Sequence, residues 1–368
     1  MRAVPLARRN LFQDRRRATL AVSGVAVALL LVLILDGVFA GALRQVTSYL
    51  RNLPADVIVS QRGVRTMHMS ASALPEDAAA DTRHVRGVAW AEAIRFTTAT
   101  VRGPAGRQLS YVIGYEPRTG RGGPREIVRG RRPGRGEAVI DEVAADQFGV
   151  GIGDSVEMLG RPFSVSGLLS GGTSITNTIA FIDTRDFAAV RGPALSYVLV
   201  GAQPGVDADR LARRLAITIP GTTAQTRDQF VEQEGRIVRD MSADVMQIMS
   251  TIAFLIALAV IALTLFTATL AKVREYAVVK ALGASSWRLT RTVLAQATWS
   301  TMLGLGLAVL LAYGVAAAVG ALSPNVRLVV EARSVERVAI AALVVGGLGA
   351  LLPLHRIARL DPATAFKG

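Results

Sequence analysis

The stretch Lys272–Arg291, KVREYAVVKALGASSWRLTR, separates two long uncharged runs and is the most informative segment for the fold. The run before it, Val245–Ala271, has 27 residues, and the run after it, Thr292–Val326, has 35. Within the stretch, five cations stand against the single acid Glu275. A loop with this basic excess between two membrane spans lies on the cytoplasmic side. The pattern therefore predicts a cytoplasmic loop between two transmembrane helices.

Four apolar segments are predicted to cross a membrane, because each approaches the roughly 20 apolar residues that a spanning helix needs. They are residues 18–43, 245–271, 292–322 and 338–354. Buried core helices are the alternative, but uncharged runs of this length are atypical of them. Cleavage of the first segment as a signal peptide is a second alternative. Its length and the interruption at Asp36 argue against that reading.

The net charge of +14 is concentrated beside these segments. The three pieces predicted to lie inside the cell carry 14 cations and three acids, whereas residues 44–244 carry 25 Arg and 22 acids. This distribution follows the positive-inside rule and favours contact with anionic membrane lipids. It predicts a multi-pass protein of the cell membrane with both termini in the cytoplasm. Nucleic-acid binding is not expected, because known motifs and interleaved aromatic residues are missing.

The predicted fold class is a membrane protein with four transmembrane α-helices, arranged as one span, a large extracytoplasmic α+β domain, and three further spans. Short runs of β-branched and aromatic residues between Gly, Pro and Asn predict the strands of that domain. The predicted strands are 56–60, 97–102, 110–115, 137–140, 155–159, 163–168, 178–182 and 197–200, and the predicted helices are 141–148 and 207–217. A basic, Gly-rich stretch at Gly120–Gly136 suggests a division into two lobes. The predicted boundaries are 1–17 cytoplasmic amphipathic segment, 18–43 first span, 44–224 α+β domain, 225–244 stalk helix, 245–271 second span, 272–291 cytoplasmic segment, 292–322 third span, 323–337 external loop, 338–354 fourth span and 355–368 cytoplasmic tail.

Small residues recur at every fourth position of the third span: Gly304, Ala308, Ala312, Ala316 and Gly320. They fall on one helical stripe, which permits close approach of a second backbone. The pattern predicts helix packing, within the chain or against a second chain. The alternative is chance spacing in an Ala-rich sequence.

The stalk predicted at residues 225–244 has an apolar stripe continuous with the second span. Gly235 lies within it and is expected to weaken the helix by roughly 1 kcal/mol. Such a stalk could transmit motion between membrane and external domain. A helix that simply packs under the domain fits the same pattern.

Catalytic chemistry has little support in the sequence. There are three histidines and no cysteine, so thiolate metal sites are excluded. The signatures of zinc peptidases, serine hydrolases and phosphate-binding loops are also missing. Met67-His68-Met69 is a candidate for a soft metal, but adjacent residues rarely converge on one ion. We therefore expect no enzyme activity, no metal and no cofactor bound by this chain.

The basic loop itself has the pattern of two short helices. Val273, Ala277, Val278 and Leu282 form an apolar stripe, and Gly283 supplies a C-cap. Ser285 or Ser286 can cap the following helix at its N-terminus.

These residues resemble the coupling segment of the FtsX-like/MacB-like permease family of ABC transporters. The resemblance is carried by Arg274-Glu275 followed by Lys280–Ser285. Arg9-Asn10-Leu11 resembles the family's opening. Segments 137–140, 151–156 and 163–167 resemble its periplasmic core domain, and 359–363 its C-terminal tail. The match extends over nearly the whole chain, in order and on the predicted sides of the membrane.

The resemblance implies a permease subunit that pairs with a second copy or a homologous permease and recruits a separate ABC ATPase, which binds the ATP. It implies export or extraction of a hydrophobic or amphipathic substrate, with a periplasmic adaptor or lipoprotein as a further partner. The bulky Tyr276 and Trp287 depart from the family pattern. The residues implied to contact the ATPase are Arg274, Glu275, Tyr276, Val279, Lys280, Ala281, Leu282, Gly283 and Ala284.

Two alternatives remain open at this point. One is an FtsX-like regulatory complex that activates an extracytoplasmic cell-wall hydrolase or relays a signal. The other is an unrelated membrane sensor that works without an ATPase.

Overall fold

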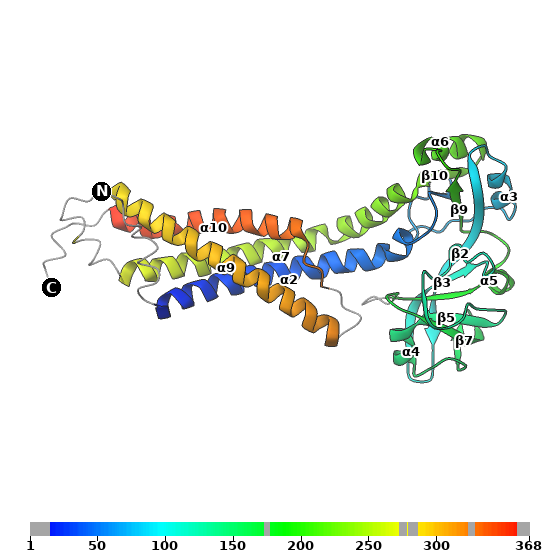
Figure 1. Ribbon diagram of the computed structural model, residues 1–368, viewed down its shortest axis with the longest axis horizontal. Helices are drawn as coiled ribbons and strands as arrows, with labels where there is room; N and C mark the ends of the chain where they lie inside the picture. Colours follow the sequence, from blue (N-terminus) through cyan, green and yellow to red (C-terminus); the bar gives the residue numbers. More distant parts are fainter. Residues whose placement is uncertain (1–14, 173–176, 272–277, 279–285, 323–327, 359–368) are drawn as a thin grey trace. The chain divides into compact units, whose positions relative to one another are not determined.

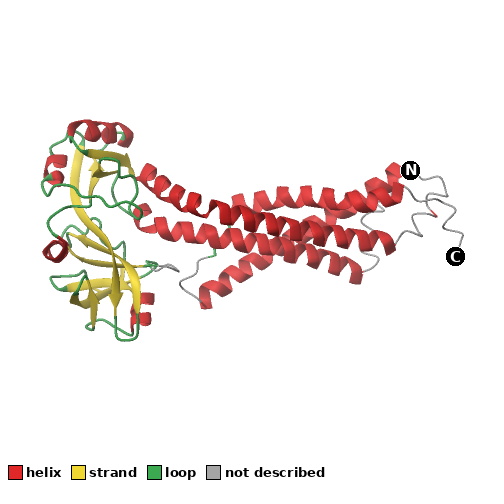
Figure 2. Cartoon of the chain, turned by 180° about the vertical axis from the view of Figure 1, so that it is seen from behind, coloured by secondary structure: helices red, strands yellow, loops and turns green. Residues whose placement is uncertain are grey.

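The computed structural model describes residues 15–172, 177–271, 278, 286–322 and 328–358. The chain forms two compact units, each considered by itself. The helical unit comprises Met1–Gly41, Ser242–Ser323 and Arg327–Gly368. The α+β domain comprises Ala42–Met241, with Pro324–Val326 assigned to it as well. Figures 1 and 2 show the strands confined to the α+β domain.

Long helices make up the described part of the helical unit: α2 (Arg15–Arg51), α7 (Arg227–Ala271), α9 (Ser286–Leu322) and α10 (Ala332–Ala358). The last residues of α2 and the first of α7 belong to the α+β domain. Two described segments, Val22–Arg51 and Thr298–Leu322, are long and apolar enough to cross a membrane. A third, Gln247–Val260, is apolar but shorter. Helix α10 begins within the range predicted as an external loop.

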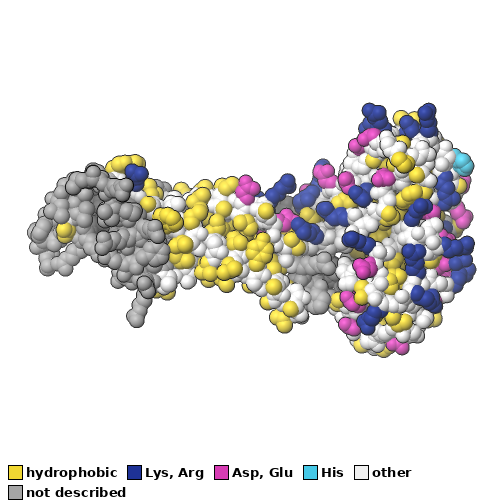
Figure 3. Space-filling view, in the orientation of Figure 1, with side chains coloured by type: hydrophobic (Ala, Val, Ile, Leu, Met, Phe, Trp, Pro, Cys, Tyr) yellow, Lys and Arg dark blue, Asp and Glu magenta, His cyan; other side chains and the backbone are white. Residues whose placement is uncertain are grey.

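Small and aliphatic side chains form the core of the helical unit. Ala308, Ala312 and Ala342 are fully buried there, together with Leu29 and Leu33 of α2. Larger apolar side chains point outward, and Figure 3 shows them over the visible face of this unit, whereas charged side chains cover the α+β domain. An apolar exterior around a core of small residues is the arrangement expected of helices packed in lipid.

The α+β domain contains ten strands linked in the order β10-β1-β9-β2-β3-β8-β5-β7-β4, with β6 pairing with both β2 and β7. The strands are β1 (Val57–Gln61), β2 (Val88–Arg102), β3 (Arg107–Tyr115), β4 (Ile127–Gly130), β5 (Glu137–Asp141), β6 (Ser155–Met158), β7 (Arg161–Leu169), β8 (Thr178–Asp183), β9 (Tyr197–Ala202) and β10 (Thr222–Thr226). The short helices are α3 (Ala78–Arg83), α4 (Glu142–Phe148), α5 (Thr184–Arg191) and α6 (Ala208–Thr218).

The first lobe is an antiparallel sheet of β10, β1, β9 and the first part of β2. Helices α3 and α6 pack on it. Val57, Val59 and Val200 of the strands share one core with Leu211 and Leu215 of α6. The alternation of apolar and charged positions in ADRLARRLAIT explains why α6 buries one face, since apolar residues three or four apart lie on one side of a helix.

The second lobe is a closed ring of strands. From the second part of β2 the order runs β3, β8, β5, β7 and β6, and β6 returns to β2 through the pair Arg102–Glu157. Closure pairs strand edges that would otherwise be open to another chain. Strand β4 is added outside the ring on β7.

The division of lobes at Gly120–Gly136 suggested by the sequence is wrong. Strand β4 lies in this stretch and pairs with β7, so the stretch belongs to the second lobe. The lobes are joined instead by β2, whose 15 residues pair first with β9 and then with β3. The glycines serve tight turns: Gly120 and Gly122 have φ values of 72° and 81°, which favour residues without Cβ.

Candidate functional site

The predicted coupling segment lies almost entirely outside the described residues. Arg274, Glu275, Tyr276, Val279, Lys280, Ala281, Leu282, Gly283 and Ala284 all fall there. Of the whole predicted segment before Ser286, only Val278 is described, as helical and exposed. Helix α7 ends at Ala271 and α9 begins at Ser286, so the helices on both sides are described.

The stripe of small residues on α9 divides into two parts. Gly304 lies so close to α2 that a Cβ placed on it would be 2.6 Å from Cγ1 of Val25. Ala308 and Ala312 are fully buried in the same core. Ala316 is half-buried, while Gly320 is exposed and has no atom within 4 Å of an added Cβ. Helix packing within the chain therefore occupies the first part of the stripe.

Asp36, the acid that interrupts the first apolar segment, is paired within the helical unit. The Arg337 guanidinium of α10 donates to its carboxylate, with 3.0 Å between Nη2 and Oδ2. The neighbouring carbonyl oxygen of Gly37 accepts a hydrogen bond from the backbone N–H of Val329 at 3.0 Å. Two contacts thus attach the start of α10 and the residues before it to α2. A carboxylate among apolar residues is costly unless it is paired in this way.

The ends of α2 and α7 that belong to the α+β domain pack together and on the sheet. Leu50 of α2 and Phe230 of α7 are fully buried in one core, and the Phe230 ring meets Tyr197 of β9 edge-on at 5.8 Å. Gly235 faces α2, where an added Cβ would lie 3.6 Å from Leu43 and 3.9 Å from Thr47. These are ordinary van der Waals distances, so the helices do not require glycine here.

Gly235→Ala is therefore expected to raise the free energy of unfolding of the α+β domain by about 0.5–1 kcal/mol, because alanine loses less backbone entropy in a helix than glycine. Thermal unfolding followed by tryptophan fluorescence measures the change. Gly201→Ala in β9 is the contrasting variant, since its Cβ would clash with Nε1 of Trp90. It should lower the melting temperature, and a loss of similar size in both variants would contradict this account of Gly235.

The side chains of Met67, His68 and Met69 lie in three different surroundings. Met67 is buried in the core, Met69 is 56% exposed, and Nδ1 of His68 lies 2.6 Å from Oε1 of Glu234 on α7. The three side chains therefore do not converge. Burial together with the Glu234 carboxylate raises the pKa of Tyr197 and of Tyr111, which both lie nearby. Sequence patterns had not indicated the contact with Glu234.

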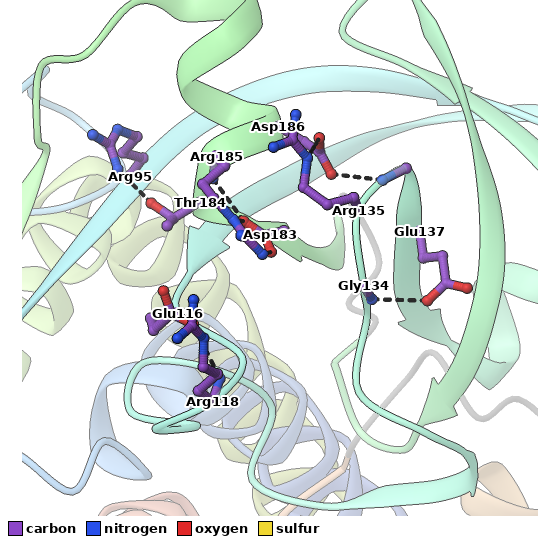
Figure 4. Close-up of polar contacts among 11 residues, drawn as sticks. Arg95, Glu116, Arg118, Gly134, Arg135, Glu137, Asp183, Thr184, Arg185 and Asp186 are labelled. Atoms are coloured by element: carbon purple, nitrogen blue, oxygen red, sulfur yellow. Dashed lines mark hydrogen bonds and ion pairs between the residues drawn. The ribbon is translucent and has the colours of Figure 1, made fainter.

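Acids of the same domain pair with two arginines of the basic, Gly-rich stretch. Arg131 forms a bidentate ion pair with Glu137, and Arg135 lies 3.2 Å from Asp186 of α5. The backbone N–H groups of Gly134 and Gly136 donate to the same two carboxylates, and Figure 4 shows the contact between Gly134 and Glu137. The N–H groups of Gly134 and Gly136 are therefore engaged within the domain and are not available to a phosphate group.

Asp183, at the end of β8, is fully buried. Its Oδ1 caps α5 by accepting from the N–H of Arg185 at 2.8 Å, and its Oδ2 lies 2.6 Å from Nη2 of Arg185. Burial raises the pKa of the carboxyl, but the hydrogen bonds and charge of Arg185, with the charge of Arg135, outweigh burial and hold the pKa below its ordinary value.

Because this pKa is lowered on folding, Asp183 stabilises the domain above the unfolded-state pKa of about 3.9, and the contribution is lost as the pH falls through the lowered folded-state pKa. Asp183→Asn should keep the helix cap and lose the charge, destabilising by about 1 kcal/mol at pH 7. The partner guanidinium is partly exposed, which limits the ionic contribution. Asp183→Ala should cost roughly 1 kcal/mol more, as a lost cap does. Melting temperatures between pH 7 and pH 3 should converge for wild type and Asp183→Asn, and parallel curves would refute this.

Comparisons with known proteins identify both parts of the chain. A family described as MacB-like periplasmic core domain matches residues 18–217, and one described as FtsX-like permease C-terminal matches residues 247–362. An uncharacterised ABC transporter permease of Mycobacterium bovis is 23% identical, covering 98% of this chain and 99% of its own. One from Mycobacterium tuberculosis has the same identity and coverage.

Two solved structures also match part of this chain. The periplasmic region of MacB from Actinobacillus actinomycetemcomitans covers 50% of this chain and 94% of its own, at 12% identity and a TM-score of 0.38. The extracellular domain of the transporter YknZ from Gram-positive bacteria covers 46% of this chain and 99% of its own, at 15% identity and a TM-score of 0.38. From the two family matches, this chain belongs to the FtsX-like, MacB-like permeases of ABC transporters.

Proposed function

We propose that this chain is the permease subunit that couples ATP hydrolysis by a separate ATPase to motion of the α+β domain, for export or extraction of a hydrophobic or amphipathic substrate. The observation that supports this most is the continuity of α7. Its helix begins at Arg227, directly after β10 of the α+β domain, and continues to Ala271. The next residue, Lys272, is the first of the predicted coupling segment. One helix therefore runs from the α+β domain to the start of that segment.

The membrane arrangement proposed with this function has four spans, within α2, α7, α9 and α10. Both termini and residues 272–291 face the cytoplasm, where the charge bias supports contact with anionic lipid. A second permease, identical or homologous, is proposed to complete the transmembrane part of the transporter. An ABC ATPase binds ATP on the cytoplasmic side. A periplasmic adaptor or a lipoprotein is a further proposed partner. The proposal assigns ATP binding and hydrolysis to the ATPase subunit.

Isolation of the tagged chain from its native membrane tests the proposal. In mild detergent and in lipid nanodiscs, we expect the chain to retain an ABC ATPase, identified by mass spectrometry. The complex should hydrolyse ATP faster than the ATPase alone. Failure to retain any ATPase under both conditions would refute the assignment. Retention of a cell-wall hydrolase together with the ATPase would instead favour a regulatory complex.

A further inference from the structure

A buried hydrogen-bonded pair, Glu234 and His68, connects α7 to the loop that follows β1. Oε1 of Glu234 lies 2.6 Å from Nδ1 of His68, and Oε2 accepts a hydrogen bond from the N–H of Met67 at 2.6 Å. The side chain of Glu234 is 1% exposed and that of His68 is 9% exposed. Both oxygens of the carboxylate are therefore engaged by the same short loop, although it lies far from α7 in sequence.

The loop is held a second time by an aromatic contact. The hydroxyl of Tyr197 donates to the carbonyl oxygen of Thr66 at 3.1 Å, and the Tyr197 ring meets Phe230 of α7. Phe230 and Glu234 are four residues apart and lie on the same side of the helix. One face of α7 therefore holds residues 66–68 both directly and through Tyr197.

His68 continues the connection into the β2–β3 hairpin. Its ring centroid lies 4.3 Å from that of Tyr111 on β3 and 5.8 Å from that of Phe96 on β2. Phe96 and Tyr111 also contact each other at 5.6 Å. The hydroxyl of Tyr111 accepts from Asn177, at the start of β8, at 2.7 Å. The contacts therefore extend from α7 to strands of the second lobe, whereas the covalent path from α7 leads into the first lobe through β10.

Stability alone does not account for a buried carboxylate at this place. Removing a carboxylate from water is costly, and well-packed apolar residues stabilise buried positions at least as well as ion pairs do. What such a pair provides is a defined geometry, because both hydrogen bonds are lost when the helix shifts relative to the loop. The arrangement suits a link that holds α7 and residues 66–68 in a fixed relative position.

We propose that Glu234 and His68 are positioning residues that pass displacement of α7 to the β2–β3 hairpin of the second lobe. The source of that displacement rests on the function proposed above, whereas the link itself does not. Leu109 of β3 is 46% exposed and lies two residues from Tyr111, so it offers a labelling position on the hairpin. The absence of cysteine from the chain permits labelling at single introduced cysteines.

Four variants of the full-length protein test the link. Glu234→Gln keeps an acceptor for Met67 and removes the charge, while His68→Phe keeps the ring contacts and removes Nδ1. Their double variant shows whether the two residues act together. Glu232→Gln is the matched control, since Glu232 lies on the same helix, is exposed, and pairs with Arg236 one turn away at 2.9 Å.

Hydrogen exchange of the hairpin is the first measurement. In nanodiscs without ATPase, amides of residues 96–98 and 109–112 should exchange about tenfold faster in both single variants, with no further increase in the double variant. The control should match the wild type, and α6 should keep its protection in all variants. Unchanged hairpin exchange would overturn the link. So would an equal increase in α6, because it would show general destabilisation instead.

The second measurement uses the complex with the ATPase. Spin labels at Leu109→Cys and Ile217→Cys, the latter 84% exposed on α6, report the distance between the lobes. We expect ATP to shift this distance in the wild type and in Glu232→Gln, and we expect Glu234→Gln and His68→Phe to lose the shift while hydrolysing ATP normally. A full shift in both single variants would overturn the proposed link. A complex without stimulated ATP hydrolysis would refute the proposed function, while the exchange measurement would still decide the link.

Discussion

A complex that carries Glu275→Lys or Gly283→Val is expected to lose permease-stimulated ATP turnover while the chain still inserts into the membrane. Glu275 is the one acid among the charged residues of 272–291. Its reversal leaves a contact surface that is wholly basic and removes any pairing with a cation of the ATPase. Gly283 is predicted at the end of a short helix with a positive φ, which costs an L-residue roughly 1–2 kcal/mol and a β-branched residue more.

The expected loss is large because residues 272–291 are the proposed contact with the ATPase. A defect in that segment should therefore remove the stimulation of ATP hydrolysis almost completely. ATP hydrolysis by purified complexes in nanodiscs measures it, with retention of the ATPase scored separately. Asp228→Lys, a charge reversal on the 86% exposed side chain of Asp228 in the first turn of α7, is the control. Stimulation equal to that of the wild type in both coupling variants would refute the assignment.

Gly304→Ala is expected to destabilise the helical unit by about 1–3 kcal/mol, the usual cost of overpacking. The new Cβ would lie 2.6 Å from Cγ1 and 2.8 Å from Cβ of Val25, and 3.3 Å from the backbone N of Ala26. A rotamer change cannot relieve the contact with Cβ, since that atom moves with the backbone of α2. The two helices must therefore separate along the first part of the α9 stripe.

Gly306 provides a matched control two residues away on the same helix. Nothing lies within 4 Å of a Cβ added there, so Gly306→Ala meets no clash and gains helix propensity. The two alanine variants should shift the melting temperature in nanodiscs in opposite directions. Tryptophan fluorescence suits the measurement, because Trp299 lies five residues before Gly304 on the same helix. Equal shifts in the same direction would show that close packing at Gly304 is unimportant.

The α+β domain shows where sequence patterns succeed. The predicted strands near 56–60, 110–115, 137–140, 163–168, 178–182 and 197–200 correspond to β1, β3, β5, β7, β8 and β9. These runs are rich in β-branched and aromatic residues that become buried, which is why periodicity finds them. The helices predicted at 141–148 and 207–217 correspond to α4 and α6, each preceded by a capping Asp.

The missed elements lack that signal. Strand β10, TTAQT, has no large apolar residue, and it is a strand because β1 pairs with it along its whole length. Strand β4, IVRG, is mostly exposed and depends on β7. The first part of β2 was missed for another reason: its pairing with β9 contains a bulge, which breaks the alternation of buried and exposed positions.

Properties that depend on neighbouring residues can be read directly from the chain: the long apolar segments, the charge bias beside them, the stripe on α9 and the family to which the chain belongs. Which distant residues meet depends on how the chain folds. Glu234 and His68 are 166 positions apart, and Arg337 and Asp36 are 301 apart. Periodicity and capping act over a few residues, so they carry no information about such pairs. Only the folded sheet and the packed helices bring these side chains within hydrogen-bonding distance.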